Sequence, residues 1–416
     1  MSKFISLIAM PNLDVSYVDS LPPSYYRVLT AVEMGMKNHD YVPLNLVISL
    51  SGIRHGSIPH IVQELLKIKL ISHIGAPIDG YALTYMGYDY LSLNVMKRRG
   101  VISAIGSRIG VGKEADVYMA MRPNGQYVVL KLHKLGRTSF KTAKTKRDYM
   151  GPRKSASWMY LSRLAAVREF GFMVALKERS FPVPDPISIN RHCVCMSYVE
   201  GIPMHAIKDI DIEAANLLAK DIHTQMVRML RYGIVHGDCN EFNAIVQTSD
   251  PENCTPETTR VVIIDFPQVI QSIAPEAEEQ FNRDVMSVEA FFNRRFGADI
   301  VLPRYNEVMR QISEEELVGQ QIDATEAFAK EMVAKYDPDE ELEIKEGDEA
   351  VDECSNSMVD DDADPVDKPK EPMMRKVVDI RQAVQRQLRK EQWRRIQHQR
   401  QSKGTEKHRD NYRRDL

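Results

Sequence analysis

Two acidic motifs in the second half of this 416-residue chain constrain its fold more than any other feature. The first motif spans residues 235–243 and places Asn243 five positions after Asp238. The second is an apolar run, 261–264, that predicts a buried strand ending at Asp265. Kinase catalytic loops present an acceptor-positioning aspartate and a metal-holding asparagine at this spacing, followed by a second metal-binding aspartate. The motifs predict a phosphotransferase with Asp238 and Asp265 as catalytic residues, and with Asn243 and Asp265 as magnesium ligands.

A glycine-containing segment upstream supplies the residues expected to hold phosphates. Glycines two positions apart let backbone amides approach phosphate oxygens, although two such glycines are also common in an ordinary hairpin. Ala115 stands where the protein-kinase glycine loop would have its third glycine. The residues of this segment expected to contact the nucleotide are Gly110, Val111, Gly112, Lys113 and Glu114.

Lys131 lies near the end of the apolar strand that follows this segment. A lysine that points inward from such a strand is costly unless a carboxylate or a phosphate meets it. We therefore predict that Lys131 is catalytic and contacts the nucleotide, the alternative being an outward-facing lysine on an edge strand. Its carboxylate partner is expected on the long helix predicted for residues 158–176, where Glu169 is the best-placed candidate and Glu178 the alternative.

The chain divides into an N-terminal region, a two-lobed region and a tail. Three short helices followed by a strand pair, the order of a winged helix, are predicted before residue 85. Strands with one long helix come next, and then a mostly helical stretch. The predicted divisions are 1–93 for the winged helix, 94–305 for the kinase-like domain with its lobes at 94–200 and 201–305, 306–336 for a helical extension, 337–372 for an acidic disordered linker, and 373–416 for a basic helical tail.

Composition narrows the remaining possibilities. The net charge of −3 combines the acidic linker with the basic tail, so it says little about partners. The five cysteines form no regular framework, which favours a reducing compartment and argues against a zinc site. No apolar run approaches the ~20 residues that cross a bilayer, so we expect no membrane partner.

Several long strings resemble the RIO atypical kinases and, within them, the RIO kinase two branch. They lie at residues 26–39, 131–140, 236–243 and 264–268. The resemblance implies an α+β fold, in which an N-terminal winged helix precedes a compact bilobal protein-kinase-like domain and a largely disordered or helical tail. It also matches the Lys- and Arg-rich residues 139–155 to a flexible loop of the family near the nucleotide.

The resemblance implies a role for each site residue. Lys131 would contact the α- and β-phosphates of ATP, and Glu169 would orient it. Asp238 would be the catalytic aspartate. Magnesium would be held by Asn243 and Asp265. The hinge that meets adenine would map to residues 196–200, with Met196, Tyr198 and Glu200 as the expected contacts.

The resemblance further implies a role in late maturation of the small ribosomal subunit. The partners would be the ribosomal RNA and assembly proteins of its precursor, and the location would be the cytoplasm, with shuttling through the nucleus left open. The protein would act chiefly as an ATPase whose Asp265 is transiently phosphorylated. The residues themselves add that no Ala-Pro-Glu string follows Asp265, so protein phosphorylation is not expected to be the main task.

Several alternatives remain open at the level of the sequence. The third predicted helix, residues 57–68, is only modestly basic, which favours docking to RNA or protein over DNA but also fits a plain solvated face. A small-molecule kinase of the aminoglycoside or choline type uses a similar His-Gly-Asp loop. A nucleic-acid-binding regulator with an inactive kinase module is the third reading.

Overall fold

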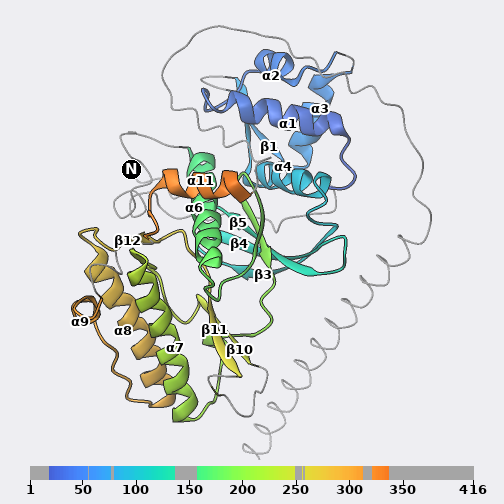
Figure 1. Ribbon diagram of the computed structural model, residues 1–416. Coiled ribbons are helices and arrows are strands. Elements are labelled where there is room, and N and C mark those ends of the chain that lie inside the picture. Colours follow the sequence, from blue (N-terminus) through green and yellow to red (C-terminus); the bar gives the residue numbers. More distant parts are fainter. Residues whose placement is uncertain are drawn as a thin grey trace, which may run out of the picture. The chain divides into compact units, whose positions relative to one another are not determined.

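The computed structural model describes residues 18–54, 56–75, 79–135, 157–248, 255, 258–312 and 321–336. The described residues all belong to one compact unit of the chain, Met1–Ile344. The predicted acidic linker, the predicted basic tail and the loop at 139–155 lie outside the described residues. Figure 1 labels the helices and strands.

The N-terminal region contains the predicted three helices followed by a hairpin. Their bounds are α1 Pro23–Gly35, α2 Leu44–Ser51, α3 Ile58–Lys67, β1 Ile71–Ile74 and β2 Gly80–Leu83. Ser57 caps α3, because its side chain accepts a hydrogen bond from the backbone N–H of His60. The strands β1 and β2 pair antiparallel. The predicted order of elements is therefore confirmed.

A fourth helix, α4 (Tyr85–Arg98), was not predicted. It spans residues 93 and 94, between which the sequence placed the division of the winged helix from the kinase-like domain. Thr84 caps it by accepting from the N–H of Gly87. A Cβ on Gly87 would lie 2.0 Å from the carbonyl oxygen of Leu70, so only glycine allows α4 to approach the hairpin this closely. Helix α4 contacts β6 and β7 of the next region, and it thus joins the two parts of the chain.

The next region is an antiparallel five-stranded sheet with one long helix, as predicted. The strand order is β3-β4-β5-β7-β6. The bounds are β3 Ala104–Val111, β4 Ala115–Met121, β5 Tyr127–His133, α6 Trp158–Glu178, β6 Pro186–Asn190 and β7 Cys193–Ser197. Helix α6 packs against β5, β6 and β7.

The region after residue 201 is mostly helical, also as predicted. Its helices are α7 Ile212–Arg231, α8 Ala277–Phe296 and α9 Tyr305–Met309, together with the short 3-10 helix η1 Met204–Ala206. Its short strands are β8 Ile202–Pro203, β9 Ile234–Val235, β10 Ala244–Thr248, β11 Thr259–Ile263 and β12 Ile270–Gln271. The antiparallel pair β10–β11 brings Asn243, just before β10, close to Asp265, just after β11.

Helix α11 (Glu326–Tyr336) returns to the first lobe and packs across α6 (Figure 1). A Cβ on Gly171 of α6 would lie 2.6 Å from the carbonyl oxygen of Ala329, so this contact is between backbones. Because the sheet covers one side of α6 and α11 covers another, most of α6 is buried. Among the described helices, none is long and apolar enough to cross a membrane.

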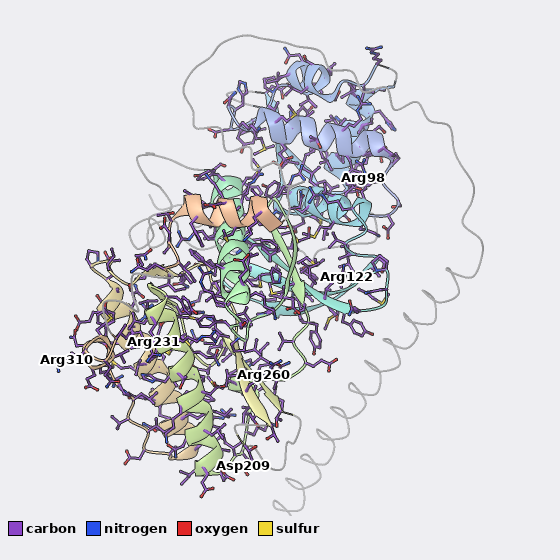
Figure 2. All side chains as sticks on the ribbon, viewed as in Figure 1. Arg98, Arg122, Asp209, Arg231, Arg260 and Arg310 are labelled. Atoms are coloured by element: carbon purple, nitrogen blue, oxygen red, sulfur yellow. The ribbon has the colours of Figure 1, made fainter. Side chains whose placement is uncertain are left out.

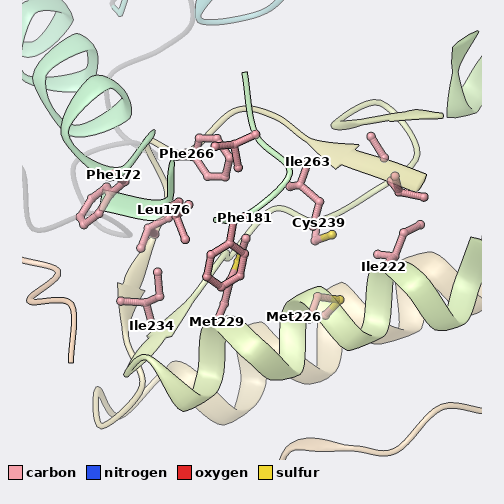
Figure 3. Packing of buried hydrophobic residues seen from close by; sticks show 14 of the residues in the cluster. Phe172, Leu176, Phe181, Ile222, Met226, Met229, Ile234, Cys239, Ile263 and Phe266 are labelled. Atoms are coloured by element: carbon pink, nitrogen blue, oxygen red, sulfur yellow. The ribbon is translucent and has the colours of Figure 1, made fainter. Parts of the chain in front are cut away.

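Two large hydrophobic cores and one small cluster hold the described part of the chain together. One combines the N-terminal helices with one face of the five-stranded sheet, and it includes Cys193 and Cys195 on the same side of β7, as their spacing predicts. The other combines α6, the helical lobe and α11. Figure 3 shows part of this second core, where Phe181 and Leu176 meet Met226 and Met229 of α7.

Candidate active site

Lys131 lies between two carboxylates, as the apolar strand around it requires. Its Nζ is 2.7 Å from Oε1 of Glu169 on α6 and 2.7 Å from Oδ1 of Asp265. The alternative partner, Glu178, instead pairs with Lys335 on the surface. Burial alone would lower the pKa of Lys131, but the charges of Asp265 and Glu169 outweigh burial and raise it. Lys131 is therefore a permanently charged group at the junction of sheet, helix and second lobe.

Asp238 is held by three side-chain amides. Asn240 Nδ2 donates to Asp238 Oδ1 at 3.1 Å, and Gln268 Nε2 donates to Oδ2 at 2.9 Å. Asn243 Nδ2 lies 3.4 Å from Oδ2 and donates to the backbone carbonyl of Asp238 at 2.8 Å. This leaves the amide oxygen of Asn243 as the atom suited to a hard cation.

Asp265 has a strained backbone conformation two residues after the end of β11. Its φ is +74°, in the left-handed region that costs a residue with a side chain about 1–2 kcal/mol. The preceding residue ties this segment to the loop of Asn243, because the N–H of Ile264 donates to the carbonyl of Asn243 at 3.0 Å. Burial would raise the pKa of Asp265, yet Lys131 lowers it below the ordinary value. Asp265 is thus an ionised carboxylate suited to bind magnesium or to act as a nucleophile.

The glycine segment forms the turn of the β3–β4 hairpin. Val111 pairs with Asp116, and the N–H of Gly112 donates to the carbonyl of Ala115 at 2.8 Å. Neither Gly110 nor Gly112 has a positive φ, and a Cβ on Gly110 would make only an ordinary contact with Val117 at 3.5 Å. The hairpin itself therefore does not require glycine at position 110. Lys113 is exposed and Glu114 is half-buried at the turn.

The predicted hinge, residues 196–200, begins in β7 and continues past its end. Met196 is buried and pairs with Val129 of β5, whereas Tyr198 is exposed beyond the end of the strand. The carbonyl oxygen of Glu200 accepts a hydrogen bond from Gln247 Nε2 at 2.9 Å. Gln247 belongs to β10, so this hydrogen bond connects the hinge to the second lobe.

Three further residues support the site and were given no role from the sequence. His133 Nε2 lies 2.6 Å from Oε2 of Glu169, the oxygen that Lys131 does not use. Gln268 orients Asp238, as described above. Asp284 accepts from the N–H of Gly237 at 2.8 Å, and burial raises its pKa to about 7. Position in the motif could have identified Gln268, but no local pattern points to His133.

Comparison with known proteins places this geometry in a family. The family model for the RIO domain matches residues 116–305, and that for the Rio2 N-terminal region matches residues 18–99. The serine/threonine-protein kinase rio2 of Schizosaccharomyces pombe is 40% identical over 310 residues, which cover 74% of this chain and 87% of the relative. The chain belongs to the Rio2 family. This membership favours the RIO reading over the small-molecule kinases that share a His-Gly-Asp loop.

Other members of the Rio2 family are also similar. The rio2 kinase of Dictyostelium discoideum is 45% identical over 285 residues, which cover 68% of this chain and 52% of the relative. The chain thus spans about half the length of that relative. A crystal structure of the Rio2 kinase of Chaetomium thermophilum in an ADP/Mg²⁺-phosphoaspartate complex is 40% identical, has a TM-score of 0.65, and covers 78% of this chain and 97% of that one.

Proposed function

We propose that this Rio2-family chain is an ATP- and magnesium-dependent atypical serine/threonine kinase and ATPase. The observation that carries the proposal is the position of Lys131, 2.7 Å from both Glu169 and Asp265. A lysine–glutamate ion pair and a metal-binding aspartate are the two elements that must be assembled for phosphoryl transfer in kinases. The related Chaetomium thermophilum kinase was solved with ADP, Mg²⁺ and a phosphoaspartate, which supports the same chemistry here.

The residues present fit a magnesium–nucleotide complex. The carboxylate of Asp265 and the amide oxygen of Asn243 are the hard oxygen donors that magnesium prefers. These two residues would hold the ion, which when bound would neutralise charge on the phosphates. Lys131 would attract the α- and β-phosphates while Glu169 keeps it in place. The backbone amides of the β3–β4 turn would cover the phosphates, and the hinge would meet adenine.

The proposed cycle passes through a covalent state of Asp265. An oxygen of the Asp265 carboxylate attacks the γ-phosphorus, the bond from that phosphorus to the β,γ-bridging oxygen breaks, and ADP leaves. Water then attacks the same phosphorus, inorganic phosphate leaves, and the carboxylate is restored. Asp238, oriented by Gln268 and Asn240, positions the attacking water or an alternative hydroxyl acceptor.

We further propose that this hydrolysis drives a release step during late maturation of the small ribosomal subunit in the cytoplasm. This part of the proposal rests on the family resemblance. The expected partners are the ribosomal RNA and assembly proteins of the precursor. Helix α3 offers modest support for docking to these partners, because its polar residues His60, Gln63 and Lys67 are exposed. One of its basic groups is already paired, because Lys67 contacts Glu64 at 2.7 Å.

The covalent step is tested with γ-labelled ATP and magnesium. The chain should acquire label that hydroxylamine removes, since acyl-phosphates react with hydroxylamine, and Asp265→Asn should abolish the label. Asp299→Asn is the matched control. Asp299 also has a positive φ, +49°, but is exposed away from the site, and asparagine tolerates this conformation. Label that resists hydroxylamine, or that persists in Asp265→Asn, would disprove the phosphoaspartate.

A further inference from the structure

Lys134 is a second buried lysine held by two carboxylates, three residues beyond Lys131. Its Nζ is 2.7 Å from Oδ2 of Asp89 and 3.0 Å from Oδ2 of Asp116. The exposed fractions of the three side chains are 6%, 1% and 3%. By contrast, the charged side chains of Arg231 and Arg260, labelled in Figure 2, are exposed. Because burying charge is costly, this cluster needs an explanation.

A buried histidine completes the cluster. His192 Nε2 lies 2.8 Å from Oδ1 of Asp89, and the hydroxyl of Ser92 lies 3.3 Å from His192 Nδ1. Burial lowers the pKa of His192, so the ring is neutral at pH 7. A neutral ring can donate from Nε2 to Asp89 and accept from Ser92 at Nδ1, which satisfies both nitrogens. The ring also stacks on Tyr88, with centroids 4.3 Å apart.

The members of this cluster come from both family-defined parts of the chain. Asp89 and Ser92 lie on α4, within the N-terminal match at 18–99. Asp116, Lys134 and His192 lie within the RIO-domain match at 116–305. Charged groups of the N-terminal region therefore contact charged groups of the kinase domain within this cluster.

The cluster also reaches the turn of the glycine hairpin. The backbone N–H of Lys134 donates to the carbonyl of Glu114 at 2.6 Å. Asp116 pairs with Val111 across the hairpin and with Leu132 across the next strand. Lys134 thus contacts the turn through its backbone N–H, while its side chain forms an ion pair with Asp89 on α4. Moving Asp89 relative to the sheet would move the turn.

We propose that Asp89 is a positioning residue for the nucleotide: through Lys134 it fixes the β3–β4 turn, so that nucleotide affinity depends on the N-terminal region. The proposal rests on the hairpin contacting the nucleotide, as proposed above. Such coupling is reciprocal, so bound nucleotide must also stabilise α4 in its contact with the sheet. A partner that displaces α4 would weaken nucleotide binding, and one that holds α4 in place would strengthen it.

The test compares Asp89→Asn with Glu33→Gln in the full chain. Glu33 lies on α1 and binds Arg191, the neighbour of His192, through two contacts of 2.7 and 2.8 Å. Both changes therefore weaken the same junction, but only Asp89→Asn reaches Lys134 and the hairpin. Titration calorimetry with MgADP should show about tenfold weaker binding for Asp89→Asn, within the usual range of coupling between sites, and unchanged binding for Glu33→Gln. Amide hydrogen exchange at residues 110–115 should rise in Asp89→Asn alone.

The unmodified chain provides a second measurement that needs no variant. Adding MgADP should slow amide exchange in α4 around Asp89 as well as in the hairpin. If MgADP leaves α4 unchanged, or if both variants lower the melting temperature equally while the dissociation constant stays the same, Asp89 is only structural and the proposal fails. Failure of the unmodified chain to bind MgADP would disprove the proposed function itself, so the two failures are distinguishable.

Discussion

The chain contains two clusters of nearly the same chemistry on one strand and its extension, and they differ in access to solvent. Lys131 meets Glu169 and Asp265, whereas Lys134 meets Asp89 and Asp116. Each cluster also includes a histidine beside a carboxylate. In the first cluster the side chain of Asp265 is 34% exposed, whereas in the second neither carboxylate exceeds 3%.

This difference shows that access, rather than the residue types, separates a reactive ion pair from a structural one. An exposed carboxylate can exchange its lysine for a metal or a phosphate at small cost. A sealed pair is shielded from water and ions, and removing one member leaves a buried charge that solvent cannot compensate. The two clusters therefore predict opposite outcomes when their lysines are removed.

The largest expected effect is on stability. Lys134→Met removes the cation that the buried carboxylates of Asp89 and Asp116 share, and breaking a buried pair in this way costs about 3–5 kcal/mol. Urea denaturation followed by circular dichroism measures the loss. Lys335→Met is the control, because the Lys335–Glu178 pair is exposed and a surface pair contributes about 1 kcal/mol or less. Equal losses of unfolding free energy in the two variants would contradict the distinction between a sealed and an exposed ion pair.

The next effect is on activity. Lys131→Met should lower phosphoryl transfer by roughly 10²–10³-fold, the usual consequence of removing one electrostatic stabiliser. It should destabilise the fold less than Lys134→Met does, because Asp265 is partly exposed and Glu169 keeps its contact with His133. ATP turnover and urea denaturation of the same preparation separate the two quantities. If Lys131→Met unfolded readily but turned over ATP at the normal rate, Lys131 would be the structural lysine and the comparison with Lys134 would be reversed.

A smaller effect concerns pH. Burial lowers the pKa of His236, next to Asp238, to about 4. As pH falls from about 6.5 to about 4, the unfolded chain takes up a proton there that the folded chain does not, so up to about 3 kcal/mol of stability is lost. His236→Asn should lose stability less steeply over that range. Melting temperatures of both proteins at stepped pH measure the slopes, and parallel curves would show that His236 contributes nothing.

The sequence alone was sufficient for the parts of the site that are local in the chain. Asp238 and Asn243 share one loop, Asp265 follows one apolar strand, and Lys131 lies near the end of another. In each case a short spacing or an apolar run defines where the side chain can point, because loop length and strand alternation are local properties. The order of helices and strands up to residue 84 follows from the same kind of pattern.

The tertiary structure decided what depends on distant segments. Whether Glu169 or Glu178 meets Lys131 depends on how α6 lies across the sheet, which no periodicity reveals. The contact of α11 with Gly171 and the role of Lys134 are equally non-local, since Asp89, Asp116, Lys134 and His192 come together only through packing of α4 and pairing of the strands. Local patterns determine which groups are charged and where each element ends. The cost of burying those charges is determined by the fold, because only the fold brings each one its partner.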